Sequence, residues 1–384
     1  MEVTQIVSLV NSATNEALGT TDILNEDLSN VIDVGTEIFN QNAVDQYTKS
    51  LVNHIGKVIF VNRAYNGAVP SVLMDGWEFG SVLEKVSAKI PVAVENDSWK
   101  LENGKSYDQY VFNAPQVSAK FFNKRVTFEI DMSYTERQVK QSFSSAEQLN
   151  AFLSMLFNNV EKSMTIKLDE LVMRTINNMT AETAAAEYGE AAFNSKSGVK
   201  AVNLLYEYNQ QNSTSLTAAE AMKTPDFLKY CAYKIGMVQS RLHRMSTLFN
   251  VGATEKFTPP EKLHTVFLSE FYSAANVYLS ANTYHNGLVK LPEADIVAYW
   301  QGSGTDYNFN STSQINVTTS AGKTVNLTGV IGVMFDRDAL GVANLERRVT
   351  TAYSAKGEFY NNFYKTDVGY FNDLNENFVV FFVA

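Results

Sequence analysis

The chain has 384 residues, of which 45% are hydrophobic, 12% aromatic and 19% charged. This composition excludes a disordered tail protein, and the length allows one large core or two smaller ones. The formal net charge of -10 excludes a large cationic surface of the kind that binds nucleic acid tightly.

The sequence carries no sign of secretion or of a membrane span. Its only cysteine is Cys231, which excludes an intrachain disulfide, makes a thiolate metal cluster untenable without partners and indicates a reducing compartment. The first residues, MEVTQIVSLVNSATNEALG, lack the basic start and the apolar core of a signal peptide. No window approaches the roughly 20 apolar residues of a membrane span. We therefore expect a soluble protein that is made and folded in a cytoplasm.

Residues 1–56 mix apolar and acidic positions, as in ILNEDLSNVIDVGTEIF, without a dense core pattern. Two interpretations fit this segment. It is either an arm that packs on another molecule or a plain N-terminal helix pair.

Within residues 57–134 the hydrophobic period becomes two. Every second side chain is apolar over residues 126–134, which predicts a half-buried strand of roughly 30 Å. Residues 86–90 alternate in the same way, and the polar stretch between the two runs contains Asn103-Gly104, which suits a tight type I′ turn. We predict a long two-stranded hairpin with a polar tip. Because an isolated hairpin is marginal in water, it must lean on the body or on another molecule.

Residues 145–179 predict one uninterrupted helix of about 50 Å, because they contain neither proline nor glycine. Capping boxes are available at Ser144 with Glu147 or at Ser145 with Gln148. Apolar residues step by three and four along the segment, so the helix should be the backbone of a domain. They are Leu149, Phe152, Leu153, Leu156, Val160, Met164, Leu168, Leu171, Val172 and Ile176.

The remaining segments predict a mixed α/β unit followed by strands. The small, polar residues 180–198 indicate an exposed connection, and helical spacing follows at residues 226–248. The stretch TPPEKLHTVFLSEFYSAA predicts a strand that enters a helix, whereas residues 301–329 are rich in turns and β-formers. The chain ends in FVVFFVA, whose unbroken apolar run predicts a buried central strand.

Three patterns that often carry chemistry are incomplete. The histidines form neither an HExxH motif nor a close pair, and Gly302-Ser303-Gly304 lacks the third glycine of a dinucleotide loop. Four N-x-S/T triplets are chance matches in the absence of a secretory signal. We therefore expect no catalytic, cofactor-binding or metal-binding residues. The histidines are His54, His243, His264 and His285, and the triplets begin at Asn212, Asn310, Asn316 and Asn326.

The segment GVMFDRDALG places Asp336 and Asp338 two residues apart, so on a continued strand they would share a face with Arg337 opposite. Paired carboxylates are common in hydrolases, but no second acidic or histidine motif completes an acid and base pair here. Aspartate is also favoured where a strand gives way to a turn. We interpret the two aspartates as structural residues at the end of a strand.

The order of these segments resembles the tailed-phage major capsid protein. Stretches such as SVLMDGWEFGSVLEKV, VSAKFFNKRVTFEIDMSYTERQVKQSFSS, MTIKLDELVMRTINN and GVMFDRDALGV are similar to the capsid subunits of phages of Gram-positive bacteria, and the resemblance covers residues 23–384. It implies the α+β capsid fold that tailed phages share with herpesviruses. The implied divisions are an N-terminal arm (1–56), an extended β-hairpin loop with its base (57–134), a peripheral domain with spine helix 145–179 (135–194), an axial domain (195–335) and a return to the peripheral domain through C-terminal strands (336–384).

The implied function is that of a subunit that self-assembles, as hexamers and pentamers, into the icosahedral head around a double-stranded DNA genome. No reaction and no cofactor are implied. Further implied partners are a separate scaffolding protein, since no charged coiled-coil precedes the arm, a portal and decoration proteins, with DNA contacted weakly and non-specifically and no membrane. Some relatives join Lys and Asn across subunits; Lys105 and Asn103 lie at the expected tip. The location would be the virion, after assembly in the bacterial cytoplasm.

Two other functions predict different outcomes. A non-enclosing surface or tail-sheath protein would assemble into tubes or flat sheets instead of closed shells. A glycoside hydrolase with paired carboxylates would lose turnover on the substitution Asp336→Asn.

Overall fold

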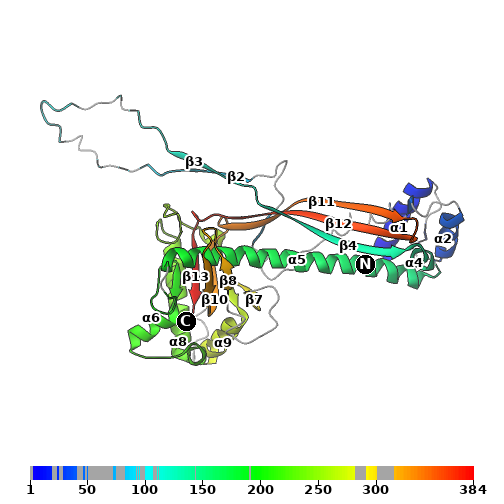
Figure 1. Ribbon diagram of the computed structural model, residues 1–384. Helices are drawn as coiled ribbons and strands as arrows, with labels where there is room; N and C mark the ends of the chain where they lie inside the picture. Colours follow the sequence, from blue (N-terminus) through cyan, green and yellow to red (C-terminus); the bar gives the residue numbers. More distant parts are fainter. Residues whose placement is uncertain are drawn as a thin grey trace.

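One helix, α5 (Ala146–Tyr188), runs the length of the body, and both large β-sheets lie along it (Figure 1). The helix begins at Ser145, whose side chain accepts a hydrogen bond from the backbone N–H of Gln148 at 3.2 Å, so the second of the two predicted caps is used. Nine of the ten predicted stripe residues are buried, and Phe152 is partly buried. The computed structural model describes residues 3–19, 24–25, 29–40, 46–47, 50, 72–74, 83–91, 93, 95, 100–106, 110, 112–142, 144–189, 192–281, 291–300 and 315–384.

Helix α5 is longer than predicted and ends at Tyr188 instead of residue 179. Its 43 residues span about 65 Å at 1.5 Å per residue. Residues 180–188, which we expected in an exposed connection, are helical, and Ala181, Ala184 and Tyr188 lie in the core. The expectation was wrong because alanine and glutamate are strong helix formers whatever their size or polarity suggests. The helix ends at Gly189, whose positive φ of 63° is a backbone angle that glycine adopts readily.

A four-stranded sheet in the order β1-β11-β12-β4 lies along α5 and packs on both halves of the helix, for example through Tyr364 on the N-terminal half and Val368 on the C-terminal half. Exposed and less exposed residues alternate along β4, as predicted for residues 126–134. The partner of β4 is β12, so the prediction that this run forms a hairpin with residues 86–90 is wrong. A period of two reports that one face is buried and says nothing of which strand lies alongside. The strands are β1 (Leu73–Met74), β4 (Arg125–Thr135), β11 (Leu340–Ser354) and β12 (Phe359–Asn372).

A five-stranded sheet in the order β5-β13-β10-β6-β7 lies beside the C-terminal half of α5. Strand β13, the predicted central strand, pairs in parallel with β5 and antiparallel with β10. Phe378, Val380 and Phe382 face the core against α5, whereas Val379 and Phe381 face a second core against α6, α8 and α9. The strands are β5 (Ala201–Asn203), β6 (Leu263–Leu268), β7 (Asp295–Val297), β10 (Val330–Asp336) and β13 (Phe378–Phe382).

The shorter elements fill in around this frame. The predicted strand and helix around residues 258–275 are present as β6 and α9, and the predicted helix at residues 226–248 is present as α8, which ends six residues earlier, at Leu242. The turn-rich β segment is described only from residue 315. These elements are α4 (Glu136–Ser142), α6 (Leu204–Asn212), α7 (Ala218–Ala221), α8 (Pro225–Leu242), η2 (Pro260–Lys262), α9 (Ser269–Ala281), β8 (Ile315–Thr318) and β9 (Thr324–Leu327).

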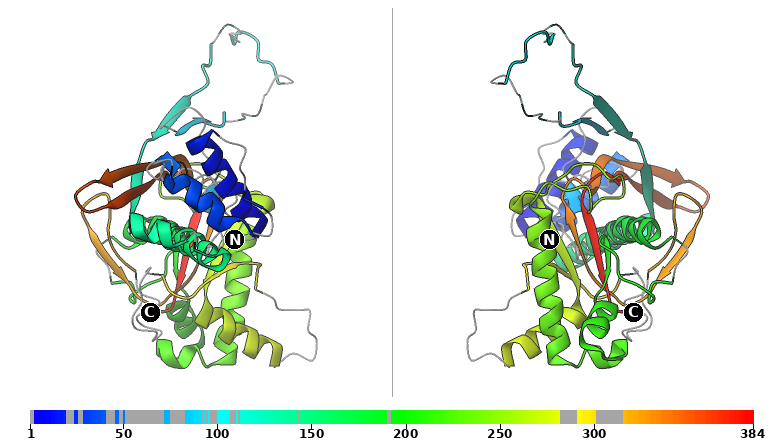
Figure 2. Two further views of the ribbon diagram at one scale, coloured as in Figure 1. Left: turned by 90° about the vertical axis from the view of Figure 1, so that its right-hand side faces the viewer. Right: turned by 90° about the vertical axis from the view of Figure 1, so that its left-hand side faces the viewer.

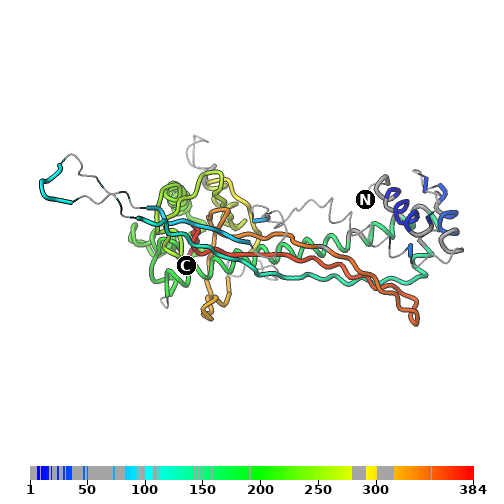
Figure 3. Tube along the Cα trace, turned by 90° about the horizontal axis from the view of Figure 1, so that it is seen from above, coloured from blue at the N-terminus to red at the C-terminus, as the bar shows by residue number. Residues whose placement is uncertain are grey.

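Two helices occupy the described part of the N-terminal segment, α1 (Val3–Leu18) and α2 (Val31–Asn40). They lie at the N-terminal end of α5, at the opposite end of the molecule from the projecting ribbon (Figure 3). Val10 and Ala13 are fully buried in the core that Leu153 of α5 shares. For these residues the interpretation as a helix pair therefore applies, and the pair packs on its own subunit.

Truncation of the stripe on α5 should destabilise the fold. We expect Leu153→Ala and Leu168→Ala each to lower the free energy of unfolding by about 2 to 5 kcal/mol, because both side chains are buried in close-packed cores. Met155→Ala is the matched control, since this side chain is 47% exposed on the same helix. Urea denaturation followed by circular dichroism measures all three, and an unchanged midpoint for either leucine variant contradicts this packing.

Removal of the last strand should prevent folding. Deletion of residues 379–384 takes a strand from the middle of the five-stranded sheet and leaves the ladders of β5 and β10 without their partner. We expect insoluble protein on expression, measured as the soluble fraction. A soluble truncated chain with the full-length far-ultraviolet spectrum would contradict a central position for β13.

Candidate interaction surface

A β-ribbon and the segment it carries project from the body (Figures 1 and 2). We call residues 83–122 the arm: they comprise β2 (Leu83–Ala88), β3 (Val117–Phe122) and the segment between them. The two strands pair antiparallel from Leu83 with Phe122 to Ala88 with Val117, and among the described residues neither pairs with a further strand. No residue of β2 or β3 is buried. The arm therefore has two open edges and no core of its own.

Large apolar side chains are exposed along the arm. Phe112 is 87% and Tyr110 85% exposed. Seven such side chains on one projecting element exceed the scattered apolar residues of an ordinary surface and mark an interaction site. The described residues at the tip itself, 102–106, are polar and exposed, as predicted, and the apolar side chains lie to either side of them. The seven are Val86, Ile90, Leu101, Tyr110, Phe112, Val117 and Phe121.

The predicted turn at Asn103-Gly104 is present, but it is not of type I′. The N–H of Lys105 donates to the carbonyl of Glu102 at 3.3 Å, and only Gly104 has a positive φ, of 88°. A type I′ turn needs positive φ at both central residues. That geometry is needed where paired strands reach the turn, and here the pairing stops far away, at Ala88 and Val117.

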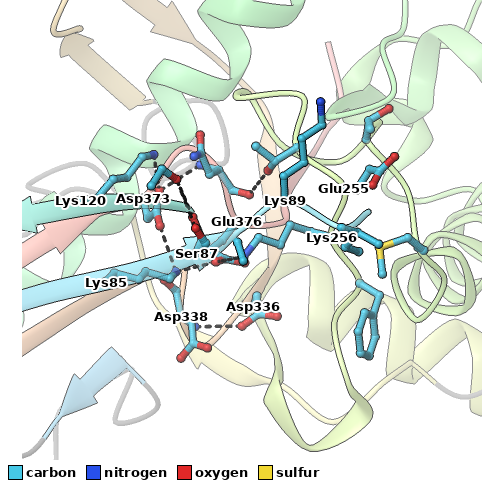
Figure 4. Close-up of a pocket in the computed structure, with 18 of the residues that line it drawn as sticks. Lys85, Ser87, Lys89, Lys120, Glu255, Lys256, Asp336, Asp338, Asp373 and Glu376 are labelled. Carbon is cyan, nitrogen blue, oxygen red and sulfur yellow. Dashed lines mark hydrogen bonds and ion pairs between the residues drawn. The ribbon is translucent and has the colours of Figure 1, made fainter. Parts of the chain in front are cut away.

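Three lysines converge on two carboxylates at the base of the arm (Figure 4). Lys85 of β2 lies 2.9 Å from Asp373 and 2.5 Å from Glu376, and Lys120 of β3 lies 2.9 Å from Asp373. Lys256, on the body, lies 2.7 Å from Glu376. The two acidic side chains are only 2% and 6% exposed. Charges so well removed from water are stable only when paired, so the carboxylates require these lysines.

Lys85 and Lys120 are directly opposite each other in the ribbon. Like charges in that position destabilise a strand pair. Asp373 relieves the repulsion because one carboxylate oxygen accepts a hydrogen bond from Lys120 and the other pairs with Lys85. The ribbon base and the residues around Asp373 therefore behave as one unit.

The two carboxylates belong to residues 373–377, which we call the junction turn because they carry the chain from β12 in one sheet to β13 in the other. A loop of residues 243–259, after α8, is hydrogen-bonded to this turn: Gly252 N–H donates to Leu374 O at 2.9 Å and Thr254 Oγ1 to Asn375 O at 2.7 Å. A groove of about 780 Å³ lies between this loop and the arm base, and the carboxylates help to line it.

Asp336 and Asp338 lie beside the junction turn, and the interpretation of a strand end is confirmed. Strand β10 ends at Asp336, whose carboxylate accepts a hydrogen bond from the N–H of Asp338 at 2.9 Å. Burial raises the pKa of Asp336. Asp338 pairs with Lys262 at 2.8 Å, and its backbone carbonyl accepts a hydrogen bond from Lys85 at 3.2 Å. The two aspartates thus lie where the chain passes from β10 in the five-stranded sheet to β11 in the four-stranded sheet.

Four residues that join the arm to the body were not predicted from the sequence: Lys85, Lys120, Asp373 and Glu376. A partial signal existed, because LEKVSA and VSAKFF alternate and each carries one lysine. Nothing local connects these lysines to acids more than 250 residues away, as in the Lys120–Asp373 pair, for which the separation is 253.

The other motifs do not assemble into a site. His243 Nδ1 contacts the carbonyl of Thr258 at 2.7 Å, and His264 is partly buried beside Phe335, where burial lowers its pKa. His54, His285, Asn310 and Gly302-Ser303-Gly304 lie outside the described residues, as does the rest of residues 301–314. Across the described ranges no group of three His, Cys, Asp or Glu side chains is placed to hold a metal ion. No helix in those ranges is long and apolar enough to cross a membrane.

Two pKa shifts show that both partners at the arm base favour their charged forms. Burial alone would raise the pKa of the Asp373 carboxyl, but hydrogen bonds from Lys120 and Lys85 outweigh it and hold the pKa below its usual value. Burial alone would lower the pKa of Lys85, but Glu376 and Asp373 beside it raise the pKa above its usual value. The pair of Lys85 and Asp373 is therefore ionised throughout the neutral range.

Comparison with protein families identifies the class. The family model described as Phi29-like phage major capsid protein matches residues 10–382. The chain belongs to this family. It is a structural subunit of a tailed-phage virion that forms the icosahedral head by self-assembly, and it is not an enzyme.

Chains in solved phage structures match the chain at very low sequence identity. A chain in the structure of the head fiber and inner core protein gp22 of native bacteriophage P68 has a TM-score of 0.51 and 9% identity, over 84% of this chain and 86% of that chain. A chain in the capsid structure of Staphylococcus phage Andhra has a TM-score of 0.49 and 11% identity over the same shares. No curated protein matches the sequence. The first likeness supports the fold alone, an α+β fold with a long spine helix.

The ion pairs at the arm base should stabilise the subunit in a pH-dependent way. A carboxyl whose pKa is lower in the folded than in the unfolded state adds stability above its unfolded pKa, and this stability is lost as the pH falls through the folded pKa. We expect Asp373→Asn to cost about 1.5 to 3 kcal/mol at pH 7, and the cost to shrink below about pH 4.

Urea denaturation at pH 7 and pH 3 measures this effect. Glu170→Gln is the control, because the pair of Glu170 with Lys167 at 2.8 Å is exposed and should contribute less than about 0.5 kcal/mol. An equal loss of stability for Asp373→Asn at both pH values would show that the effect comes from packing and not from charge.

Proposed function

We propose that the arm is the element by which one subunit holds its neighbour in the shell. The observation that carries this proposal is the exposure of seven large apolar side chains on the arm. The strands of the arm, β2 and β3, contain no buried residue, so they add nothing to the core of their own subunit. Removal of such surface from water stabilises association by about 25 cal/mol per Å² of apolar area. A second copy of the chain is the partner that a self-assembling shell supplies to every arm.

The open strand edges support the same role. Each edge of the ribbon presents backbone N–H and C=O groups that a neighbouring chain can pair. In a closed shell the contact recurs at every equivalent pair of subunits, so even a weak contact has a large combined effect. The arm thus contributes little to the folding of one subunit and much to the lattice.

We propose five functional divisions: an N-terminal arm (1–56), distinct from the arm of residues 83–122 and packed on its own subunit through α1 and α2, the extended loop and its base (57–134), a peripheral domain with the spine helix (135–194), an axial domain at the five-fold and six-fold axes (195–335) and a return through C-terminal strands (336–384). The pairing of β13 with β5 and β10 favours including the last strand in the axial domain. The pairing of β11 and β12 with β4 favours a peripheral position for residues 340–372.

Further partners complete the proposal. We propose a separate scaffolding protein, a portal and decoration proteins, and weak, non-specific contact with packaged double-stranded DNA, which the net charge of -10 favours. Assembly would take place in the cytoplasm of the bacterial host. At the tip, Lys105 and Asn103 are of the two residue types that crosslink in some relatives, and Lys105 lies 4.0 Å from Glu102 at an exposed position.

The arm should be dispensable for folding and required for assembly. We expect replacement of residues 90–116 by a short Gly-Ser turn to leave a cooperative thermal melt, because the ribbon pairs and all the buried residues of the described chain remain. Circular dichroism and sedimentation measured side by side should show folded subunits and only small species.

A milder variant tests the apolar contacts themselves. Leu101→Ser combined with Phe112→Ser should reduce the yield of shells, whereas the matched control Lys100→Ser with Gln116→Ser, on the same segment, should not. Closed shells of normal size from the replacement variant would contradict the proposed role of the arm. Tubes or flat sheets from the unaltered protein would favour the tail-sheath alternative.

A further inference from the structure

The direction of the arm depends on very few contacts. The strands of the ribbon bury no residue, so no hydrophobic core holds the ribbon against the body. The described attachments at its base are the ion pairs of Lys85 and Lys120, the hydrogen bond from Lys85 to the Asp338 carbonyl, and the contact of the Phe122 and Phe371 rings at 5.1 Å between centroids. Beyond these contacts, the described residues between 88 and 119 extend away from the body and are exposed (Figure 1).

The charged attachments fix the ribbon on both of its strands. Lys85 and Lys120 are cross-strand neighbours, and both reach the same carboxylate, that of Asp373. Because the two strands are held side by side at one level, the ribbon resists rotation about its long axis as well as bending. One ion pair on one strand would permit either motion.

The body side of this attachment is rigid. The junction turn is covalently continuous with β12 and β13, one in each sheet, and Asp373 N–H donates to Ala339 O at 2.7 Å in the neighbouring crossing. Lys256 holds Glu376 from the side of the 243–259 loop at 2.7 Å. Both carboxylates are therefore also anchored from the body side, Asp373 through its backbone and Glu376 through Lys256.

A small rotation at the base of the arm produces a large displacement of its tip. From Lys89 to Glu102 the chain spans at most about 45 Å at 3.3 Å per residue, so a rotation of about 10° at the base would move the tip by up to about 8 Å. Such a displacement would shift the tip by more than one residue along a neighbouring subunit. The angle at the base is thus a determinant of how neighbouring subunits tilt.

We propose that Asp373 and Glu376, together with Lys85 and Lys120, form a joint that sets the direction of the arm and through it the curvature of the shell. In this proposal the four are positioning residues, which act through the arm. This inference rests on the proposed function of the arm. It adds that specificity for one shell size is built into the base of the arm as well as into its contact surface.

The experiment breaks the joint from both sides. One variant, Lys85→Met with Lys120→Met, removes the charges of the ribbon, and a second, Asp373→Asn, removes the charge of the body. A third variant combines all three substitutions. It serves as the test if the double lysine variant fails to fold because the buried Asp373 carboxylate has lost its cations, since in the combined variant that charge is removed as well. Lys200→Met is the matched control, because Lys200 pairs with the partly buried Glu187 at 2.8 Å in the body, away from the arm.

Two measurements are made on each full-length variant. Hydrogen exchange by mass spectrometry reports the protection of residues 83–122 relative to α5, and electron microscopy reports the distribution of shell diameters. We expect the joint variants to exchange faster in the arm by at least tenfold, with α5 unchanged, and to form shells of mixed size or open curvature. The control should keep the uniform shells and the arm protection of the parent protein.

The outcomes separate this inference from the proposed function. Uniform shells of parental size from the combined variant would overturn the joint, whether or not its arm exchanges faster, and would leave the role of the arm intact. A failure of the arm itself would appear in the Gly-Ser replacement, which keeps Lys85 and Lys120 and would then still form shells.

Discussion

A single helix that is longer than either core gives this subunit its shape. The N-terminal half of α5 closes a core beneath the four-stranded sheet, and its C-terminal half closes a second core to which both sheets contribute. Because the helix has no proline or glycine over its 43 residues, it transmits position from one end to the other without a hinge. Every other element is placed relative to this rod: α1 and α2 at one end, the five-stranded sheet and its helices at the other (Figure 3).

Two sheets on one rod must be connected, and the connections hold three of the four carboxylates that are buried in the described part of the chain. The chain crosses between the sheets at residues 336–339 and again at the junction turn. The two crossings are joined by backbone hydrogen bonds, from Asp336 N–H to Asn377 O at 3.0 Å and from Asp373 N–H to Ala339 O. Aspartate, asparagine and glutamate are suited to such turns, and their burial creates carboxylates that need cations. The lysines of the arm supply that charge.

Apolar side chains have two different roles in this subunit, which explains why an acidic chain carries so much exposed apolar surface. Apolar side chains that face the two cores fold the subunit, whereas those on the arm are left for a neighbour. A protein whose task is self-association has to reserve part of its apolar surface in this way, since burial within the subunit would remove the driving force for assembly. The family to which the chain belongs is one of capsid subunits, for which this reserve is the function.

The sequence by itself determined the elements whose signal is local. Three local patterns predicted three elements: period two over residues 126–134 predicted β4, the apolar stripe at spacings of three and four after Ser145 predicted α5, and the unbroken run FVVFFVA predicted β13. These predictions succeeded because side-chain periodicity follows directly from backbone geometry. Resemblance along the chain identified the capsid fold, and the end of a strand at Asp336 was correctly predicted. The predicted C-terminal end of α5 was wrong because residues 180–188 have small and polar side chains, which are typical of a connection, and yet have high helix propensity.

Only the tertiary structure decided which elements meet. Strand β4 pairs with β12, more than 200 residues away, and Lys120 of the arm pairs with Asp373. Periodicity states that a face is buried or that a lysine points to one side; it carries no information about the partner. The same limit concealed the exposed apolar side chains of the arm, since apolar residues in a polar stretch are exposed or buried according to what folds against them. Partner choice is set by the combined packing of distant segments, which no local pattern contains.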